Sequence, residues 1–199
     1  MMVYYAHHLK RRYTNMSEEI VYKRRNLRKV NKTRWITVTA LFMALNIALS
    51  SFGIPVLGGR LYLCDAIICT AALLLDPVAA FIVGGIGSFL GDFIFYPLPM
   101  FVSLATHGLQ ALVISLISCN AVNLSKKKYF VVCLIATIIG GIIMVTGYTL
   151  GKIFVYSNFE TAMIKLPFEI AQAVLGIVLS LLLCFKFKLN KLFNKMELY

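Results

Sequence analysis

Residues 84–100 read GGIGSFLGDFIFYPLPM and carry a single acid, Asp92, in one of the most apolar parts of the chain. Two prolines follow it, Pro97 and Pro99. Proline lacks a backbone N–H and its ring clashes with the preceding helical turn, so a helix that enters this stretch has to end before Pro97. The stretch therefore predicts two apolar helices joined by a short turn, with a carboxylate about one helical turn from the end of the first.

The composition around this stretch is that of an integral membrane protein. Of 199 residues, 60% are hydrophobic and 14% are charged, and the mean hydropathy is +0.82. A helix needs about 20 apolar residues to cross a hydrocarbon core about 30 Å thick. We expect an all-α bundle of six transmembrane helices, over residues 35–52, 61–75, 77–95, 98–122, 129–152 and 163–187. The second segment is short, so it has to be tilted, incomplete, or continued by loop backbone that protein shields from lipid.

The basic residues flank the apolar segments. We expect a membrane domain over residues 34–188 between a basic tail, 1–33, and a short basic C-terminal tail, 189–199. With the N-terminus in the cytoplasm, the inner side holds ten Lys and Arg before residue 35, three at 126–128 and four after Phe185, against three on the outer side. The positive-inside rule then places both termini in the cytoplasm. Such short basic segments suit anionic lipid, and we expect no nucleic acid partner despite the net charge of +12.

Motifs for catalysis and for metal binding are absent from the sequence. It contains no GxxxxGK[ST] phosphate loop, no HExxH and no GxSxG. Its five cysteines lie in apolar runs without a CxxC pair, as expected of small buried hydrophobes. We therefore expect a protein that is not an enzyme, with no catalytic residue, no metal and no cofactor.

Small residues recur at four-residue spacing on three of the expected helices. The rows are Ala40, Ala44 and Ala48 on the first helix, Ala80, Gly84, Ser88 and Asp92 on the third, and Gly147 and Gly151 on the fifth. Small side chains let two helix backbones approach closely in a membrane. Each row can pack within this chain or dock a partner membrane protein, and the spacing favours packing.

Most of the ionisable groups of the expected helices fall toward the outer end of the bundle. Asp92 can pair near its turn or line a cavity, and these two readings are equal. Asp65 can complement a helix N-terminus or contact a ligand. His107 is more often a packed, satisfied residue than a ligand contact, whereas Lys152 and Glu169 can form an ion pair that lowers the cost of burying both. Polar and aromatic residues gathered at one end of a bundle predict a small-molecule pocket.

The order of these features resembles the S components of energy-coupling factor (ECF) vitamin transporters. The resemblance rests on GGRLYLCDAIICTAALLLDPVAAFIVGGIGSFLGDFIFYP, residues 58–97, with HGLQAL, TGYTLGKIFVY and LPFEIAQAVLGIVLSLLL further on, and covers about residues 32–188. Within that family the chain looks most like the branch of hydroxymethylpyrimidine and pyridoxine carriers and the riboflavin-type group. Lys152 and Glu169 depart from that branch, where we expect an acid near the first position and an amide near the second.

The resemblance implies a six-helix S-component bundle in the cell membrane of a bacterium. Such a protein captures a vitamin or vitamin precursor outside the cell, and B6 or hydroxymethylpyrimidine is favoured here, with riboflavin or folate as further possibilities. Its partners would be a transmembrane T component and two cytosolic ATPases that supply the energy. The resemblance also assigns the row Ala40, Ala44 and Ala48 to docking of the T component.

The substrate would then lie between the first outer loop, GIPVLGGRLY, and helices four to six. Tyrosines would stack on a flat ring, the loop would close over it, and polar side chains would make the remaining contacts. The candidate substrate-binding residues are Arg60, Tyr62, Asp65, Asp92, Tyr96, His107, Gln110, Tyr148, Lys152, Glu169 and Gln172. One alternative is a membrane scaffold or assembly subunit without ligand. Another is a stand-alone secondary transporter, but the sequence shows no inverted repeat of the kind found in such transporters.

Overall fold

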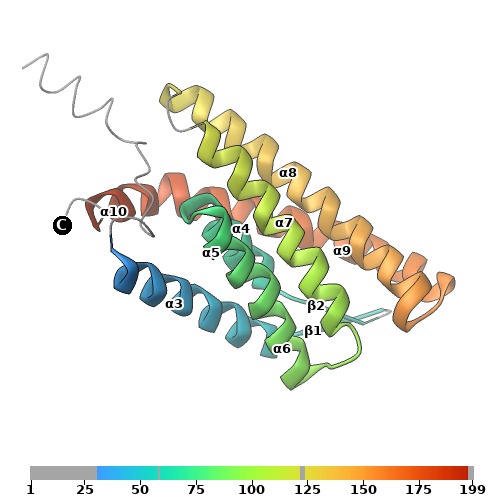
Figure 1. Ribbon diagram of the computed structural model, residues 1–199. Coiled ribbons are helices and arrows are strands. Elements are labelled where there is room, and N and C mark those ends of the chain that lie inside the picture. Colours follow the sequence, from blue (N-terminus) through green and yellow to red (C-terminus); the bar gives the residue numbers. More distant parts are fainter. Residues whose placement is uncertain (1–30, 58, 122–123, 197–199) are drawn as a thin grey trace, which may run out of the picture.

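The computed structural model describes residues 31–57, 59–121 and 124–196 (Figure 1). Its long helices are α3 (Lys32–Ser51), α7 (Met100–Asn120), α8 (Lys126–Gly151, continued by η3, Lys152–Tyr156) and α9 (Phe159–Leu181, continued by η4, Leu182–Lys186). A further rod consists of α5 (Pro77–Phe81), η2 (Ile82–Ile86) and α6 (Gly87–Phe95). Within the described residues, these five rods are long and apolar enough to cross a membrane. The predicted all-α membrane bundle is confirmed.

The second predicted segment is a short, buried helix. Helix α4 (Cys64–Leu74) is apolar and has 11 residues, which give a length of about 16 Å. Of these residues, all but Ile67 are buried, so α4 lies in the core of the bundle. The preceding loop forms an antiparallel hairpin of strands β1 (Ile54–Val56) and β2 (Gly59–Leu61). A short helix continued by ordered loop backbone was one of the three arrangements that the sequence allowed.

The turn between α4 and α5 is fixed by Asp76. Its carboxylate accepts hydrogen bonds from the backbone N–H groups of Val78 (3.1 Å) and Ala79 (3.3 Å), which have no partner within the helix. Pro77 occupies the first helical turn, where its missing N–H costs nothing. The indole N–H of Trp35 on α3 also donates to Asp76 and ties α3 to this turn.

A π-helical turn, η2, interrupts the rod that runs from Pro77 to Phe95. Asn46, buried on α3, donates from Nδ2 to the Val83 carbonyl (2.7 Å) and to Ser88 Oγ (3.1 Å). On the other side, a Cβ on Gly84 would lie 2.6 Å from the carbonyl oxygen of His107 on α7. Only glycine allows this approach, which brings His107 close to the centre of the bundle.

The three rows of small residues have different environments. Ala80, Gly84 and Ser88 are buried, and Asp92 is half-buried. On α8, Gly147 and Gly151 face Thr106 and Val102 of α7, so that row packs within the chain as the spacing favoured. By contrast, Ala40, Ala44 and Ala48 are exposed on α3. The alanine row therefore has no packing role within the described part of the chain.

The chain turns sharply after η4, where Lys188 has a φ of 59°. Helix α10 (Leu189–Met196) follows this turn and lies near the start of α3, at the end of the bundle opposite the hairpin (Figure 1). Phe193 of α10 packs on Phe42 of α3, with ring centroids 5.9 Å apart. The predicted basic tail before residue 31 lies outside the described residues.

Candidate functional site

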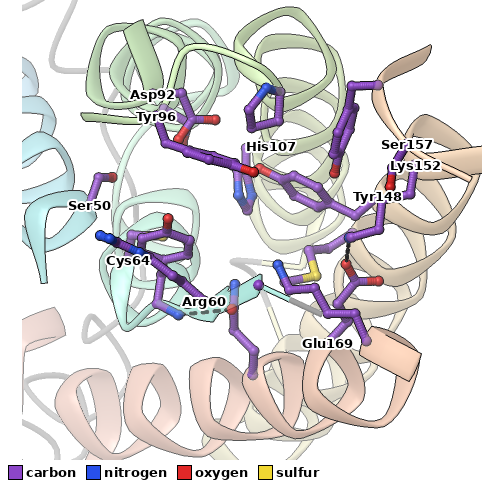
Figure 2. A pocket seen from close by; sticks show the side chains of 18 of the residues that line it. Ser50, Arg60, Cys64, Asp92, Tyr96, His107, Tyr148, Lys152, Ser157 and Glu169 are labelled. Carbon is purple, nitrogen blue, oxygen red and sulfur yellow. Dashed lines mark hydrogen bonds and ion pairs between the residues drawn. The ribbon is translucent and has the colours of Figure 1, made fainter. Parts of the chain in front are cut away.

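One cavity of about 260 Å³ lies at the hairpin end of the bundle, between the hairpin, α6, α7, η3 and α9 (Figure 2). Nine of the eleven candidate substrate-binding residues line this cavity, and they come from segments far apart in the sequence. The nine are Arg60, Tyr62, Asp92, Tyr96, His107, Tyr148, Lys152, Glu169 and Gln172.

The wall formed by η3 and α9 contains a buried ion pair. The Lys152 ammonium contacts the Glu169 carboxylate, and each residue is about 2% exposed. Thr149 donates a second hydrogen bond to Glu169 (3.3 Å). The predicted pair is confirmed, and its geometry explains how two charges tolerate burial, because each compensates the other.

Asp92 on the opposite wall belongs to a chain of three hydroxyl and carboxylate groups. The hydroxyl of Ser103 donates to the Asp92 carboxylate and lies 2.6 Å from the hydroxyl of Tyr148. A serine hydroxyl has one proton, so Tyr148 has to donate to Ser103. Asp92 thus both forms a hydrogen bond near its turn and lines the cavity. The two roles that the sequence allowed for it are compatible.

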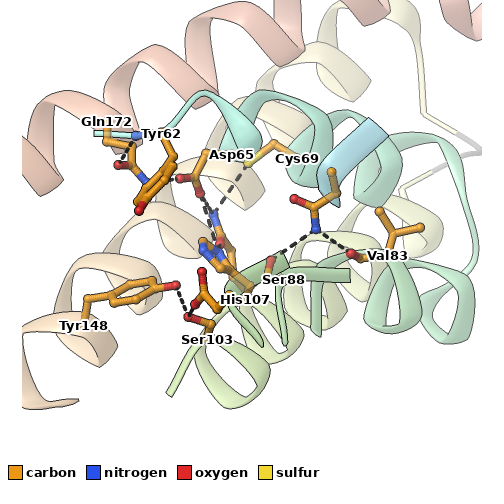
Figure 3. A network of polar contacts seen from close by, with 12 residues as sticks. Tyr62, Asp65, Cys69, Val83, Ser88, Ser103, His107, Tyr148 and Gln172 are labelled. Atoms are coloured by element: carbon orange, nitrogen blue, oxygen red, sulfur yellow. Dashed lines mark hydrogen bonds and ion pairs between the residues drawn. The ribbon is translucent and has the colours of Figure 1, made fainter. Parts of the chain in front are cut away.

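Asp65 and Gln110 were expected to contact substrate, and they do not line the cavity. They lie behind its wall as part of a buried network (Figure 3). Asp65 accepts one hydrogen bond from Gln110 (3.1 Å) and another from Gln172 (2.5 Å). Both amide groups are thereby oriented with their carbonyl oxygens pointing away from Asp65. The carboxylate organises the site from behind, as a buried group with two donors can.

The orientation of the two amides directs their carbonyl oxygens toward His107 and toward the backbone of Tyr62. Gln110 Oε1 faces His107 Nδ1 at 2.7 Å, so Nδ1 carries the proton and Nε2 of the neutral ring is an acceptor. Gln172 Oε1 accepts from the backbone N–H of Tyr62 (2.9 Å), which ties the loop after β2 to α9. The network therefore fixes both the tautomer of His107 and the position of the loop.

Four tyrosines and His107 give the cavity an aromatic lining: Tyr62, Tyr96, Tyr148, Tyr156 and the imidazole. The rings of His107 and Tyr148 meet edge to face at 5.2 Å. Lys152 Nζ lies 5.5 Å from the ring centroid of Tyr148. Burial, and then the charge of Asp92, raises the pKa of Tyr62 to about 12, so its phenol stays neutral near pH 7.

Among the residues that the structure describes, Cys64, Asp65 and His107 form a cluster of potential metal ligands. Their ligand atoms lie within 4.8 Å of one another, and all three residues are buried. Both oxygens of Asp65 already accept hydrogen bonds, and Nδ1 of His107 is turned to Gln110. The arrangement is that of a hydrogen-bonded wall, and a metal would have to displace two amide groups.

Several lining residues were not among the candidates. The charged one among them is Lys165 on α9, one of the three basic residues that the sequence places on the outer side. Its stem lies against the hairpin, because a Cβ on Gly59 would meet Lys165 Cδ, Cε and Nζ at 3.2 Å. Ser50, Cys64, Ser88, Met144 and Thr161 also line the cavity. Serine, cysteine, threonine and methionine are too common in apolar helices for the sequence to have distinguished these five.

Comparison with known proteins gives two results. The sequence model of a family described as "ECF-type riboflavin transporter, S component" matches residues 30–189. The chain is also 29% identical over 144 residues to a protein of Pyrococcus woesei described as "Uncharacterized protein in gap 3'region". That alignment covers 72% of this chain and 88% of the relative.

Proposed function

Because the chain belongs to the family of ECF-type riboflavin transporter S components, we propose that it captures a vitamin or vitamin precursor with one flat heteroaromatic ring. An S component is a multi-pass membrane protein that binds the substrate of an ECF transporter. It is a transport subunit and not an enzyme. We favour a B6 vitamer or a hydroxymethylpyrimidine as the substrate, bound on the outer side of the membrane.

The observation that carries this proposal is the size and lining of the cavity. Pockets for drug-sized ligands usually have volumes of about 300–1,000 Å³, and this cavity has about 260 Å³. Tyrosine rings on several sides suit a flat ring, and His107, Gln172 and the loop supply hydrogen bonds at its edge. A compact single-ring molecule fits these dimensions best.

Riboflavin is the second candidate, and the description of the matching family favours it. Its three fused rings and five-carbon chain need more room than a single ring. Folate is longer still. Either molecule would need a larger cavity than the about 260 Å³ of this structure.

We further propose that the hairpin acts as the lid. Strands β1 and β2 project over the cavity, and Arg60 on β2 lines it. Gly59 has a φ of 150°, a conformation that few residues other than glycine adopt. The hydrogen bond from Tyr62 N–H to Gln172 then couples the closed lid to the substrate-binding wall.

Energy would come from partner proteins, a T component and two cytosolic ATPases. We propose that Ala40, Ala44 and Ala48 form the docking face for the T component. The three alanines are exposed, and the neighbouring Leu41 and Leu45 are 59% and 42% exposed, so this face of α3 is free for a second helix. We also propose that both termini lie in the cytoplasm of a bacterial cell, because that orientation places seventeen of the twenty Lys and Arg on the inner side.

The test combines binding and uptake. The purified chain is titrated with pyridoxine, 4-amino-5-hydroxymethyl-2-methylpyrimidine, riboflavin and folate, and uptake of the bound compound is measured in cells with and without a T component and its ATPases. We expect binding of a single-ring compound by the isolated chain and uptake only with the partners. Uptake without them would indicate a secondary transporter, and a chain that binds none of the four would indicate a scaffold.

A further inference from the structure

Two half-buried charged side chains of the cavity, Lys165 and Asp92, have no opposite charge within ion-pairing distance among the described residues, and Arg60, the remaining unpaired charge of the lining, is exposed. Lys152 and Glu169 neutralise each other, whereas Lys165 on α9 and Asp92 on α6 do not meet. Among the residues that the structure describes, no carboxylate lies within ion-pairing distance of the Lys165 ammonium. Each of the two residues nevertheless lies within range of the electrostatic field of the other. The cavity is therefore bounded by a positive side and a negative side.

Lys165 is placed where it can donate to a ligand. Its stem and ammonium lie close to Gly59 of the hairpin, since a Cβ on Gly59 would be 3.2 Å from Lys165 Cδ, Cε and Nζ. A half-buried ammonium that lacks a carboxylate partner is costly, because burial removes part of its water. An anionic or strongly accepting group of a ligand would supply what the protein does not.

Asp92 is placed where it can accept from a ligand. Its Oδ2 receives the Ser103 hydroxyl, while no donor from the described residues reaches Oδ1. The Tyr148–Ser103 chain holds the carboxylate in one orientation, since each hydroxyl of that chain already has its proton assigned. Cationic or N–H groups of a ligand are the natural partners of the free oxygen.

Building on the proposed function, we infer that the substrate is a dipolar heteroaromatic ring that is bound in one orientation. An anionic or accepting edge faces Lys165, and a protonated or amino-bearing edge faces Asp92. The Lys152–Glu169 pair adds no net charge to this arrangement. A 3-hydroxypyridine ring is dipolar in this sense, because its zwitterion has a phenolate and a protonated ring nitrogen. An aminopyrimidine is less dipolar.

The test changes the ligand and the protein together. Binding of pyridoxine and of its 3-O-methyl ether, which cannot form the phenolate, is measured by titration calorimetry with wild type, Lys165→Gln and Lys165→Arg. Wild type should prefer pyridoxine roughly tenfold or more, because a hydrogen bond to a charged group is lost in the ether. Lys165→Gln should lose that preference with little change for the ether, and Lys165→Arg should keep most of it.

The other side of the cavity is tested with Asp92→Asn. This variant should bind pyridoxine and 4-amino-5-hydroxymethyl-2-methylpyrimidine roughly tenfold more weakly. Binding of the pyridoxine ether should change less, because the ether does not form the zwitterion and its ring nitrogen has no proton to donate to Asp92. Lys127→Gln and Glu160→Gln are the charge controls, since both side chains are exposed on α8 and α9 and lie outside the cavity lining. Neither control should change affinity by more than about twofold, well below the effect of a lost charged hydrogen bond.

The outcomes separate this inference from the proposed function. Equal affinity of wild type for pyridoxine and its ether would overturn the inference of a dipolar substrate and leave the proposed vitamin-binding role intact. This comparison uses wild type alone, so it does not depend on whether a variant folds. Effects of Lys165→Gln or Asp92→Asn no larger than those of the controls would overturn it as well. Binding of riboflavin but of neither single-ring compound would also overturn it. A wild-type chain that binds no vitamin would remove the proposed function itself.

Discussion

Breaking the Lys152–Glu169 pair should destabilise the protein more than removing both charges. In Lys152→Met the Glu169 carboxylate keeps only the hydrogen bond from Thr149, and in Glu169→Gln the ammonium loses its only anionic contact among the described residues. Both groups are about 2% exposed, so neither can turn to bulk water. In the double variant, no uncompensated charge remains.

The magnitude follows from the burial of both groups. Removal of one partner of a buried ion pair typically costs about 3–5 kcal/mol, whereas replacement of the whole pair by neutral groups is often close to neutral. For a chain of this size, each kcal/mol lowers the Tm by about 2–4 °C. Each single variant should therefore melt roughly 6–20 °C below wild type, and the double variant should recover most of that loss.

Thermal unfolding in mild detergent, followed by circular dichroism, measures all four proteins of the cycle. Lys127→Met and Glu160→Gln are matched controls, because they remove exposed charges from the same two helices. They should shift the Tm by no more than about 2 °C, as expected of surface substitutions. Single variants that behave like these controls, or a double variant whose loss equals the sum of the singles, would refute the reasoning.

Three further predictions concern packing and docking. Gly84→Ala should lower the Tm by roughly 2–12 °C, because the added methyl group meets a backbone carbonyl of α7. Gly141→Ala is the control and should be tolerated, since the nearest neighbours of its methyl group lie at 3.3 Å or more. Equal Tm shifts of the two variants would contradict this prediction. Asn46→Ala leaves the Val83 carbonyl without its side-chain donor and should cost about 1–3 kcal/mol in thermal unfolding. Ala44→Leu should abolish uptake with intact vitamin affinity, and full uptake would remove the docking proposal.

The sequence predicted the helices of this protein well, because a membrane span has a strong signal. Long apolar runs bounded by Asp76–Pro77 and Pro97 define where rods begin and end, and the structure follows them within a few residues. The largest differences are of four residues: the rod of α8 and η3 continues to Tyr156, where the predicted helix ended at 152, and α9 begins at Phe159, where the predicted helix began at 163. Helix ends near a membrane surface have no sharp apolar boundary. The hydrophobicity pattern therefore predicts the ends of a helix less accurately than its middle.

The hairpin and the π-helical turns were beyond the reach of sequence patterns. Two strands of three residues are too short for any alternation to be visible. The η2 turn depends on partners from other helices, such as Asn46. That asparagine, in the middle of an apolar span, was a signal in itself, since a polar side chain at that depth needs a partner.

The candidate site was predicted as a group more accurately than residue by residue. Placing polar residues at the outer end of each helix was sufficient to collect nine of the nineteen residues that line the cavity. It could not distinguish Asp65, which lies behind the wall, from Lys165, which lines the cavity, because both belong to outer turns of helices. Whether a side chain lines the cavity or lies behind its wall depends on how neighbouring helices cross. No local sequence pattern encodes these crossings.

The most direct test of the central claim is mass spectrometry of small molecules released by heat from the protein, purified in mild detergent out of cells grown in rich medium. We expect a single-ring vitamin or precursor in near-stoichiometric amount. An empty protein that also gives no thermal shift with pyridoxine, the hydroxymethylpyrimidine or riboflavin would contradict a substrate-binding role for this cavity.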